Sequence, residues 1–285
     1  TRLRTVTGVQ TCALPIYDLP LGNLYVHGDD LLVAGLERLY VLSGSDSALA
    51  SLTARIAREP TAEVYAERGA MLTGLGRPAE ALADLREAWK RQRGAEGEDA
   101  ARGRLLDGLY RVASQDPGAE DRCFREAREV AATHEERAFA TWRAAQCSER
   151  KGDTNTALSL YTSMLTGPDA LIRRDPEWEV SARLLAAHRL RALVGRDEVR
   201  WHALLDAPAA QELARLGAKA EHKDLIELAT LFAGPPAGKE AALAAARIEA
   251  EKKDFGIAAA VLQRTMALSP ASLRGEIAGE LARLY

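Results

Sequence analysis

The segment of this chain that comes nearest to a cofactor-binding motif is Gly234–Glu240, with the sequence GPPAGKE. A phosphate-binding loop places GxxxxGK[ST] between a strand and a helix, so that backbone amides and the lysine hold the phosphates. Here the glycines are one residue too close, and Glu240 stands where Ser or Thr is needed. The preceding segment, Leu225–Phe232, is patterned as a helix rather than a strand. We therefore expect no nucleotide binding at this segment.

The histidines and cysteines are also poorly spaced for metal binding or nucleophilic catalysis. The five histidines are His27, His134, His188, His202 and His222. They form no HExxH motif and no pair four residues apart, the spacing that lets two imidazoles share a zinc ion on one helix. Cys123 and Cys147 belong to no CxxC motif, so we interpret both as small apolar core residues. With no GxSxG elbow present, the sequence predicts no catalytic residue, no metal and no cofactor.

Composition indicates a helix-rich globular chain. Its 285 residues are 47% hydrophobic and 28% charged, and Ala and Leu, the strongest helix formers, are abundant. The formal net charge of −3 gives no electrostatic reason to expect nucleic acid or an anionic membrane as a partner. The sequence also lacks the run of about 18 apolar residues that a transmembrane helix requires.

Helical periodicity runs from Ser47 to the end of the chain. Apolar residues recur about every 3.6 positions, and the breaks between runs carry Gly, Pro or Asp. The pattern predicts fourteen helices, over 47–58, 61–75, 78–92, 99–114, 118–132, 134–151, 154–166, 176–195, 197–205, 208–221, 223–233, 237–252, 255–268 and 270–284. Helices of similar length joined by short turns are typical of antiparallel pairs in an α-solenoid.

Residues 61–92 have the spacing of a tetratricopeptide repeat. Gly69 is the small residue at which the following helix should cross closely, and Ala81 is its expected partner on that helix. Arg68 departs from the pattern, because a leucine is usual there. Partial matches occur around Gly108, Ala145 and Ala246. The chain thus resembles a tetratricopeptide-like α-solenoid and is assigned to the all-α class; an unrelated helical bundle is the alternative.

The tetratricopeptide resemblance implies a peptide-binding groove on the exposed side of the first helix of each pair. In this register the candidate groove residues are Arg102, Leu105, Leu109, Phe139, Trp142, Gln146, Glu149 and Arg150. This mixed set lacks the Lys and Asn cluster with which some family members grip a terminal carboxylate. The alternative is that Phe139 and Trp142 are buried between repeats, which would make Trp142 important for stability rather than binding.

The N-terminal part has a different pattern. Apolar residues alternate from Leu21 to Leu42, which predicts a meander of three short strands within 17–46. Within it, Asp29–Leu42 resembles part of one blade of a quinoprotein-like β-propeller; a self-contained hairpin cap on the helices is the alternative. Residues 6–16 resemble a translated sequencing adapter, so we interpret 1–16 as an unstructured artefact of a metagenomic fragment and exclude it from fold reasoning.

These observations predict a non-enzymatic protein–protein interaction scaffold, in which residues 47–285 are the helical-repeat part of a larger bacterial multi-domain protein. Its partner is expected to be a protein or peptide. The alternative is the accessory helical half of a larger enzyme, a quinoprotein or a kinase with propeller and repeats, which upstream sequence would reveal. The propeller resemblance implies a location in the cell envelope or periplasm.

Overall fold

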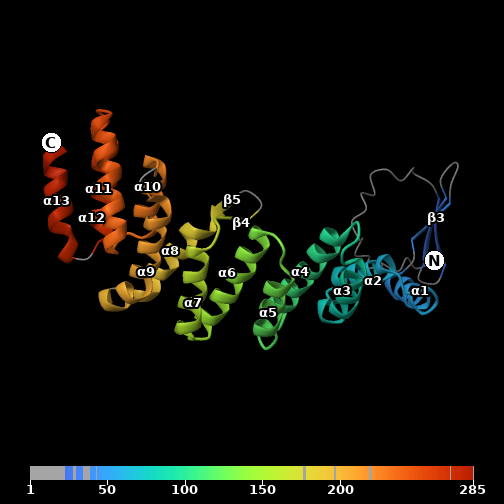
Figure 1. The fold of residues 1–285 in the computed structure, drawn as a ribbon. Coiled ribbons are helices and arrows are strands. Elements are labelled where there is room, and N and C mark those ends of the chain that lie inside the picture. Colours follow the sequence, from blue (N-terminus) through green and yellow to red (C-terminus); the bar gives the residue numbers. More distant parts are fainter. Residues whose placement is uncertain are drawn as a thin grey trace, which may run out of the picture. The chain divides into compact units, whose positions relative to one another are not determined.

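A computed structural model gives the three-dimensional structure of the chain. The residues that it describes are 23–27, 30–34, 39–42, 44–175, 178–195, 197–217, 220–269 and 271–284. They contain thirteen helices and five short strands (Figure 1). The chain divides into two compact units, unit 1 ending at Ala131 and unit 2 beginning at Ala132. The predicted helical region is therefore shared between two units, and residues 1–16 lie outside the described residues.

Unit 1 contains a small antiparallel sheet. Its strands are β1 (Asn23–His27), β2 (Asp30–Ala34) and β3 (Leu39–Leu42). They are hydrogen-bonded in the order β1-β2-β3, with Val26 opposite Leu31 and Val33 opposite Tyr40. The meander predicted from the alternating pattern is thus confirmed.

Five helices follow in unit 1. They are α1 (Ser45–Arg58), α2 (Ala62–Gly74), α3 (Pro78–Gln92), α4 (Glu98–Gln115) and α5 (Glu120–Val130). Each packs mainly against the next along the chain. Between α2 and α3, Gly76 takes a φ of +74° and the Arg77 amide donates to the Leu72 carbonyl at 2.9 Å, which closes the last turn of α2. Pro78 then opens α3, where a missing amide hydrogen costs nothing.

Leu85 of α3 packs tightly between a glycine of α2 and a glycine of α4. A Cβ on Gly69 would lie 2.8 Å from Leu85 Cδ2 and 3.5 Å from the Ala81 carbonyl oxygen. A Cβ on Gly108 would lie 2.7 Å from Leu85 Cδ1. Leu85 and Ala81 are both buried. The predicted close approach of Gly69 to Ala81 is confirmed, and Gly108 adds a second one to the same leucine.

Arg68, the departure from the repeat pattern, forms an ion pair in place of the apolar contact. Its Nε and Nη2 donate to the two carboxylate oxygens of Asp84 on α3, each at 2.7 Å. Its Nη1 donates to Thr53 Oγ1 of α1 at 3.1 Å. Asp84 is buried, and its hydrogen bond raises the pKa of the Arg68 guanidinium. One side chain thus connects α1, α2 and α3.

Unit 2 contains the remaining eight helices and a hairpin. Its elements are α6 (His134–Arg150), α7 (Thr154–Thr166), β4 (Leu171–Asp175), β5 (Trp178–Ser181), α8 (Ala182–Val194), α9 (Glu198–Leu216), α10 (His222–Leu231), α11 (Pro236–Glu251), α12 (Phe255–Leu268) and α13 (Ala271–Leu284). Helices adjacent in sequence again pack as neighbours, most extensively α10 with α11 and α6 with α7. The predicted all-α, solenoid-like packing of neighbouring helices is confirmed.

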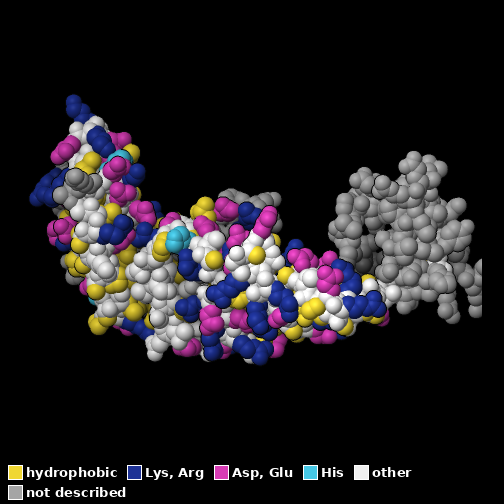
Figure 2. All heavy atoms as spheres, turned by 45° about the vertical axis from the view of Figure 1, so that its right-hand side comes forward, with side chains coloured by type: hydrophobic (Ala, Val, Ile, Leu, Met, Phe, Trp, Pro, Cys, Tyr) yellow, Lys and Arg dark blue, Asp and Glu magenta, His cyan; other side chains and the backbone are white. Residues whose placement is uncertain are grey.

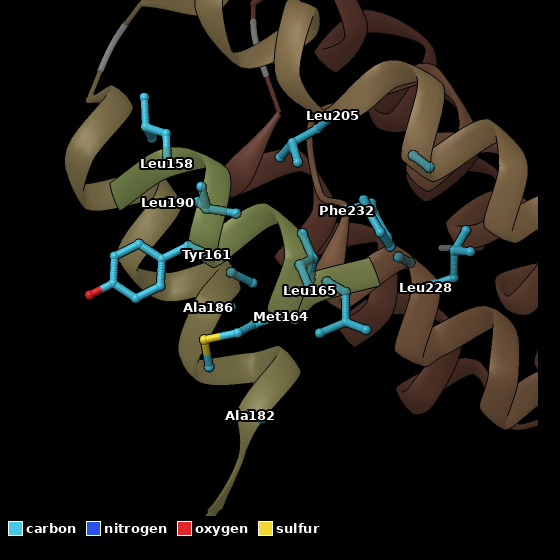
Figure 3. Close-up of a cluster of buried hydrophobic side chains, with 14 of the residues drawn as sticks. Leu158, Tyr161, Met164, Leu165, Ala182, Ala186, Leu190, Leu205, Leu228 and Phe232 are labelled. Atoms are coloured by element: carbon cyan, nitrogen blue, oxygen red, sulfur yellow. The ribbon is translucent and has the colours of Figure 1, made fainter. Parts of the chain in front are cut away.

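The core of unit 2, part of which Figure 3 shows, contains leucines and alanines from the six consecutive helices α6 to α11. Tyr161 and Leu165 of α7 lie beside Ala186 and Leu190 of α8, and all four have less than 2% of their surface exposed. Leu228 of α10 extends the cluster. The alanines let the helix backbones approach closely, and the leucines fill the space between them.

The prediction of one helix over residues 176–195 is wrong at the N-terminal end of that segment. β4 and β5 pair there, with Ile172 opposite Val180, and α8 begins only at Ala182. Both β-branched residues favour strands, and burial of Ile172 in the core favours the hairpin. The Ser181 hydroxyl accepts a hydrogen bond from the Leu184 amide at 3.2 Å, which caps α8.

The helices predicted over 197–205 and 208–221 are one helix, α9, with Pro208 inside it. A proline removes one backbone hydrogen bond from a helix, so the sequence pattern indicates a break. Leu205 and Ala209 on either side of it are both fully buried. We attribute the continuous helix to this burial, which outweighs the local preference of proline.

We expect Gly108→Ala to destabilise the chain by about 1–3 kcal/mol relative to Gly74→Ala, although both changes favour helix formation. The new Cβ at residue 108 meets Leu85, which cannot retreat because Gly69 already contacts it. At Gly74 a Cβ meets nothing within 4 Å. Urea unfolding followed by circular dichroism measures both. In a Leu85→Ala background the penalty at residue 108 should fall to what the remaining contact with Leu82 Cδ2, at 3.3 Å, imposes. An undiminished penalty would contradict the packing described.

Candidate functional site

The unit 1 members of the predicted groove lie on the buried side of α4. Leu105 and Leu109 are 0% exposed and Arg102 is 5% exposed, with its Nη2 at 2.8 Å from Asp99 Oδ1. In this structure the two leucines have no surface to offer a ligand.

The unit 2 members all lie on α6. Trp142 is 7% exposed and belongs to the hydrophobic core, while Phe139 is half-buried with its ring centroid 5.6 Å from that of Trp142. Gln146 and Glu149 are half-buried, and Arg150 is exposed. The burial of Trp142 favours its interpretation as a core residue over that of a binding anchor.

Glu149 is engaged within unit 2. Tyr161 Oη donates to Glu149 Oε2 at 3.1 Å, and the Arg189 guanidinium donates to Oε1. In Figure 3 the Tyr161 hydroxyl points away from the leucine side chains. Burial of the ring, together with the negative charge of Glu149, raises the pKa of Tyr161 to about 12. These three side chains connect α6, α7 and α8, so Glu149 contributes to the fold.

A pocket in unit 2 has a volume of about 570 Å³. The end of α7, the segment leading into β4, α8 and α9 form its walls. Its lining residues are Thr166, Gly167, Pro168, Asp169, Arg183, Pro208, Gln211, Glu212, Arg215 and Phe232. Sequence analysis missed this pocket, because it depends on the unexpected hairpin and on the continuity of α9 past Pro208.

Arg183 holds the walls of this pocket together. Its Nε donates to the Leu165 carbonyl at 3.0 Å, its Nη1 to Glu227 at 3.0 Å and its Nη2 to Glu212 at 3.1 Å. Arg215 also donates two hydrogen bonds to Glu212, each at 2.9 Å. These contacts, chiefly the hydrogen bond from Arg215, lower the pKa of Glu212.

The rim of the pocket is fixed by the hairpin. Ser181 Oγ, which also caps α8, donates to Asp169 Oδ1 at 2.8 Å. Gln211 is exposed on α9, and its side-chain amide forms no hydrogen bond with another described residue. The pocket therefore combines proline rings with one uncommitted amide.

A second pocket, of about 290 Å³, lies in unit 1 between α2 and α4. Its lining residues are Ala70, Thr73, Gly74, Leu85, Arg104, Asp107 and Arg111. The three charged residues share α4 with the predicted groove but lie on its exposed face. Their spacing of three and then four residues was a signal of a common face that sequence analysis did not use.

Comparison with known proteins assigns no family: no family model and no curated protein matches the chain.

Within the described residues, no three His, Cys, Asp or Glu side chains are grouped so that they could hold a metal ion. No described helix is both long enough and apolar enough to cross a bilayer. On the face shown in Figure 2, acidic and basic side chains are interspersed over the described surface.

We expect Trp142→Ala to lower the free energy of unfolding by about 3–5 kcal/mol, the usual cost of removing a buried aromatic ring. Trp142→Phe should cost much less, because Trp142 Nε1 forms no hydrogen bond in the described part of the chain. Thermal melts of the two variants measure the difference. If the Trp142→Ala variant melted at the same temperature as the parent, the core interpretation would be wrong and Trp142 would be a residue of the exposed groove.

We expect alkaline pH to destabilise the chain through Tyr161. Its pKa is about 12 in the folded chain, against about 10 when unfolded, so the folded state keeps the proton longer. The stabilisation is complete below pH 10 and is lost as pH rises from 10 towards 12, by up to about 2–3 kcal/mol.

Tyr161→Phe is the matched control for this effect. It lacks the titrating hydroxyl, so urea unfolding at several pH values should show a weaker alkaline loss than in the parent. Equal losses in the two chains would assign the effect to other groups.

Proposed function

We propose that the chain is a non-enzymatic protein-interaction scaffold of tetratricopeptide-like helix pairs, and that it binds a peptide segment of a partner protein in the unit 2 pocket. The observation that carries the proposal is that pocket. Its volume of about 570 Å³ falls within the range of about 300–1,000 Å³ typical of ligand sites. The neighbouring packing of helices and the close contact of Gly69 with Ala81 and Leu85 support the repeat assignment.

The electrostatics of the pocket favour binding over proton-transfer chemistry. General acid–base catalysis requires a group whose pKa lies near the working pH. The pKa of Glu212 is lowered instead, so this carboxylate is ionised and weakly basic. Arg183 is held by three acceptors, so the wall is preorganised and loses little conformational entropy when a ligand binds.

The lining suits a peptide segment. Pro168 and Pro208 present apolar rings, and the Gln211 amide can both donate to and accept from a peptide backbone. Two arginines face two acidic residues, Asp169 and Glu212, so the pocket has no excess charge. A neutral, polar segment would match it best.

The wider setting of the scaffold rests on sequence resemblance alone. In this proposal the helices are part of a larger bacterial protein, β1–β3 are the remnant of a propeller blade, and the protein lies in the cell envelope.

Selection of phage-displayed random peptides on the full chain tests the proposal. Gln211→Trp fills the pocket from an exposed position on α9, so selected peptides should bind this variant about tenfold more weakly or worse. Ala214→Trp, also exposed on α9 but outside the pocket lining, is the matched control and should bind like the parent. Failure to enrich any peptide, or equal binding by Gln211→Trp, would refute the proposal.

A further inference from the structure

We propose that the unit 1 pocket between α2 and α4 binds a side-chain carboxylate of an acidic peptide segment. This site is separate from the unit 2 pocket, and its ligand differs in charge. The lining contains two arginines, Arg104 and Arg111, and one aspartate, Asp107, which leaves one excess positive charge.

Arg104 is the principal binding group. It is exposed, and its guanidinium forms no ion pair or hydrogen bond with another described residue, so all five of its side-chain N–H donors are available to a ligand. A guanidinium can hold a carboxylate through two parallel hydrogen bonds, which gives both strength and orientation.

Arg111 is positioned by Asp107. Its Nε lies 2.8 Å from Asp107 Oδ2, and this contact fixes the guanidinium one helical turn from the aspartate. Its Nη donors form no hydrogen bond with another described residue. The two arginines are seven residues apart on α4, so they lie on the same helix face, and both line the pocket.

The opposite wall leaves room for a ligand. Ala70 and Gly74 of α2 are small and exposed, and a Cβ on Gly74 would meet nothing within 4 Å. The buried Leu85 side chain forms an apolar base. A low-dielectric base strengthens charge interactions beside it relative to those in bulk water.

The charge balance selects a carboxylate over a phosphate. One carboxylate neutralises the single excess charge of the pocket, whereas a phosphorylated side chain carries about −1.5 to −2, leaves excess negative charge there and is repelled by Asp107 more strongly than a carboxylate is. The expected partner is therefore a protein segment containing Glu or Asp.

Fluorescence anisotropy on the full chain tests this inference. The probe is a fluorescein-labelled peptide of alternating Glu and Ala with an amidated C-terminus, so that only side chains supply carboxylates. It should bind about tenfold more tightly than the same peptide with Gln, and added salt should weaken it. Undetectable Glu-peptide binding, equal affinity for the Gln peptide, or tighter binding of a phosphoserine counterpart would overturn the inference.

Two glycine variants locate the site. Gly74→Glu places a carboxylate inside the pocket, and Gly103→Glu makes the same charge change at an exposed position of α4 outside the lining. Neither new Cβ meets an obstacle, so both variants should fold, which circular dichroism checks. Gly74→Glu and Arg104→Gln should abolish binding of the Glu peptide and Gly103→Glu should retain it. Equal losses in the two glycine variants would overturn the site.

The unit 2 variant separates the two proposals. Gln211→Trp should leave binding of the Glu peptide unchanged, whatever it does to peptides selected on the unit 2 pocket. If Gln211→Trp abolished binding of the Glu peptide, the acidic segment would bind in unit 2 and the unit 1 site would be refuted.

Discussion

The contact of Leu85 with two glycines determines how α2, α3 and α4 lie against one another in unit 1. Because neither Gly69 nor Gly108 carries a Cβ, both helices approach α3 closely enough to enclose one leucine side chain. At that separation Arg68 can reach Asp84 with two hydrogen bonds. The same leucine forms the base of the α2–α4 pocket, so the residue that sets the helix spacing also shapes the surface that we propose binds a ligand.

In unit 2 the helices are fixed relative to one another by a charged side chain, Arg183, rather than by an apolar contact. Arg183 donates to the end of α7, to α9 and to α10, so one guanidinium fixes three elements around an open pocket. A guanidinium is costly to bury without acceptors, and here each of its three nitrogens donates one hydrogen bond, at 3.0–3.1 Å. The Ser181–Asp169 contact adds the hairpin to this arrangement.

Local signals were sufficient to predict most helices, and tertiary contacts decided the exceptions. The glycine and proline between α2 and α3 mark a turn whatever surrounds them. By contrast, Ile172 belongs to a strand, and Pro208 lies within a helix, in segments whose neighbours are buried in the core. The residues of an exposed groove were harder still to predict. Leu105 and Leu109 share the side of α4 that other residues cover, whereas Arg104 lies on the side that stays open. Helical spacing predicts which residues share a face, but not which face is covered.

The two pockets differ in how their charged side chains are paired, and this difference is the basis on which we propose different ligands for them. In unit 2 the two arginines and two acidic residues balance, and Glu212 already accepts from both Arg183 and Arg215. A ligand there would gain little from charge and must rely on shape and on hydrogen bonds to groups such as Gln211. In unit 1 only one of two arginines is paired, so attraction to an anion adds to the fit and depends on ionic strength. In our proposal, the chain therefore distinguishes neutral from acidic segments through the pairing of a few surface charges.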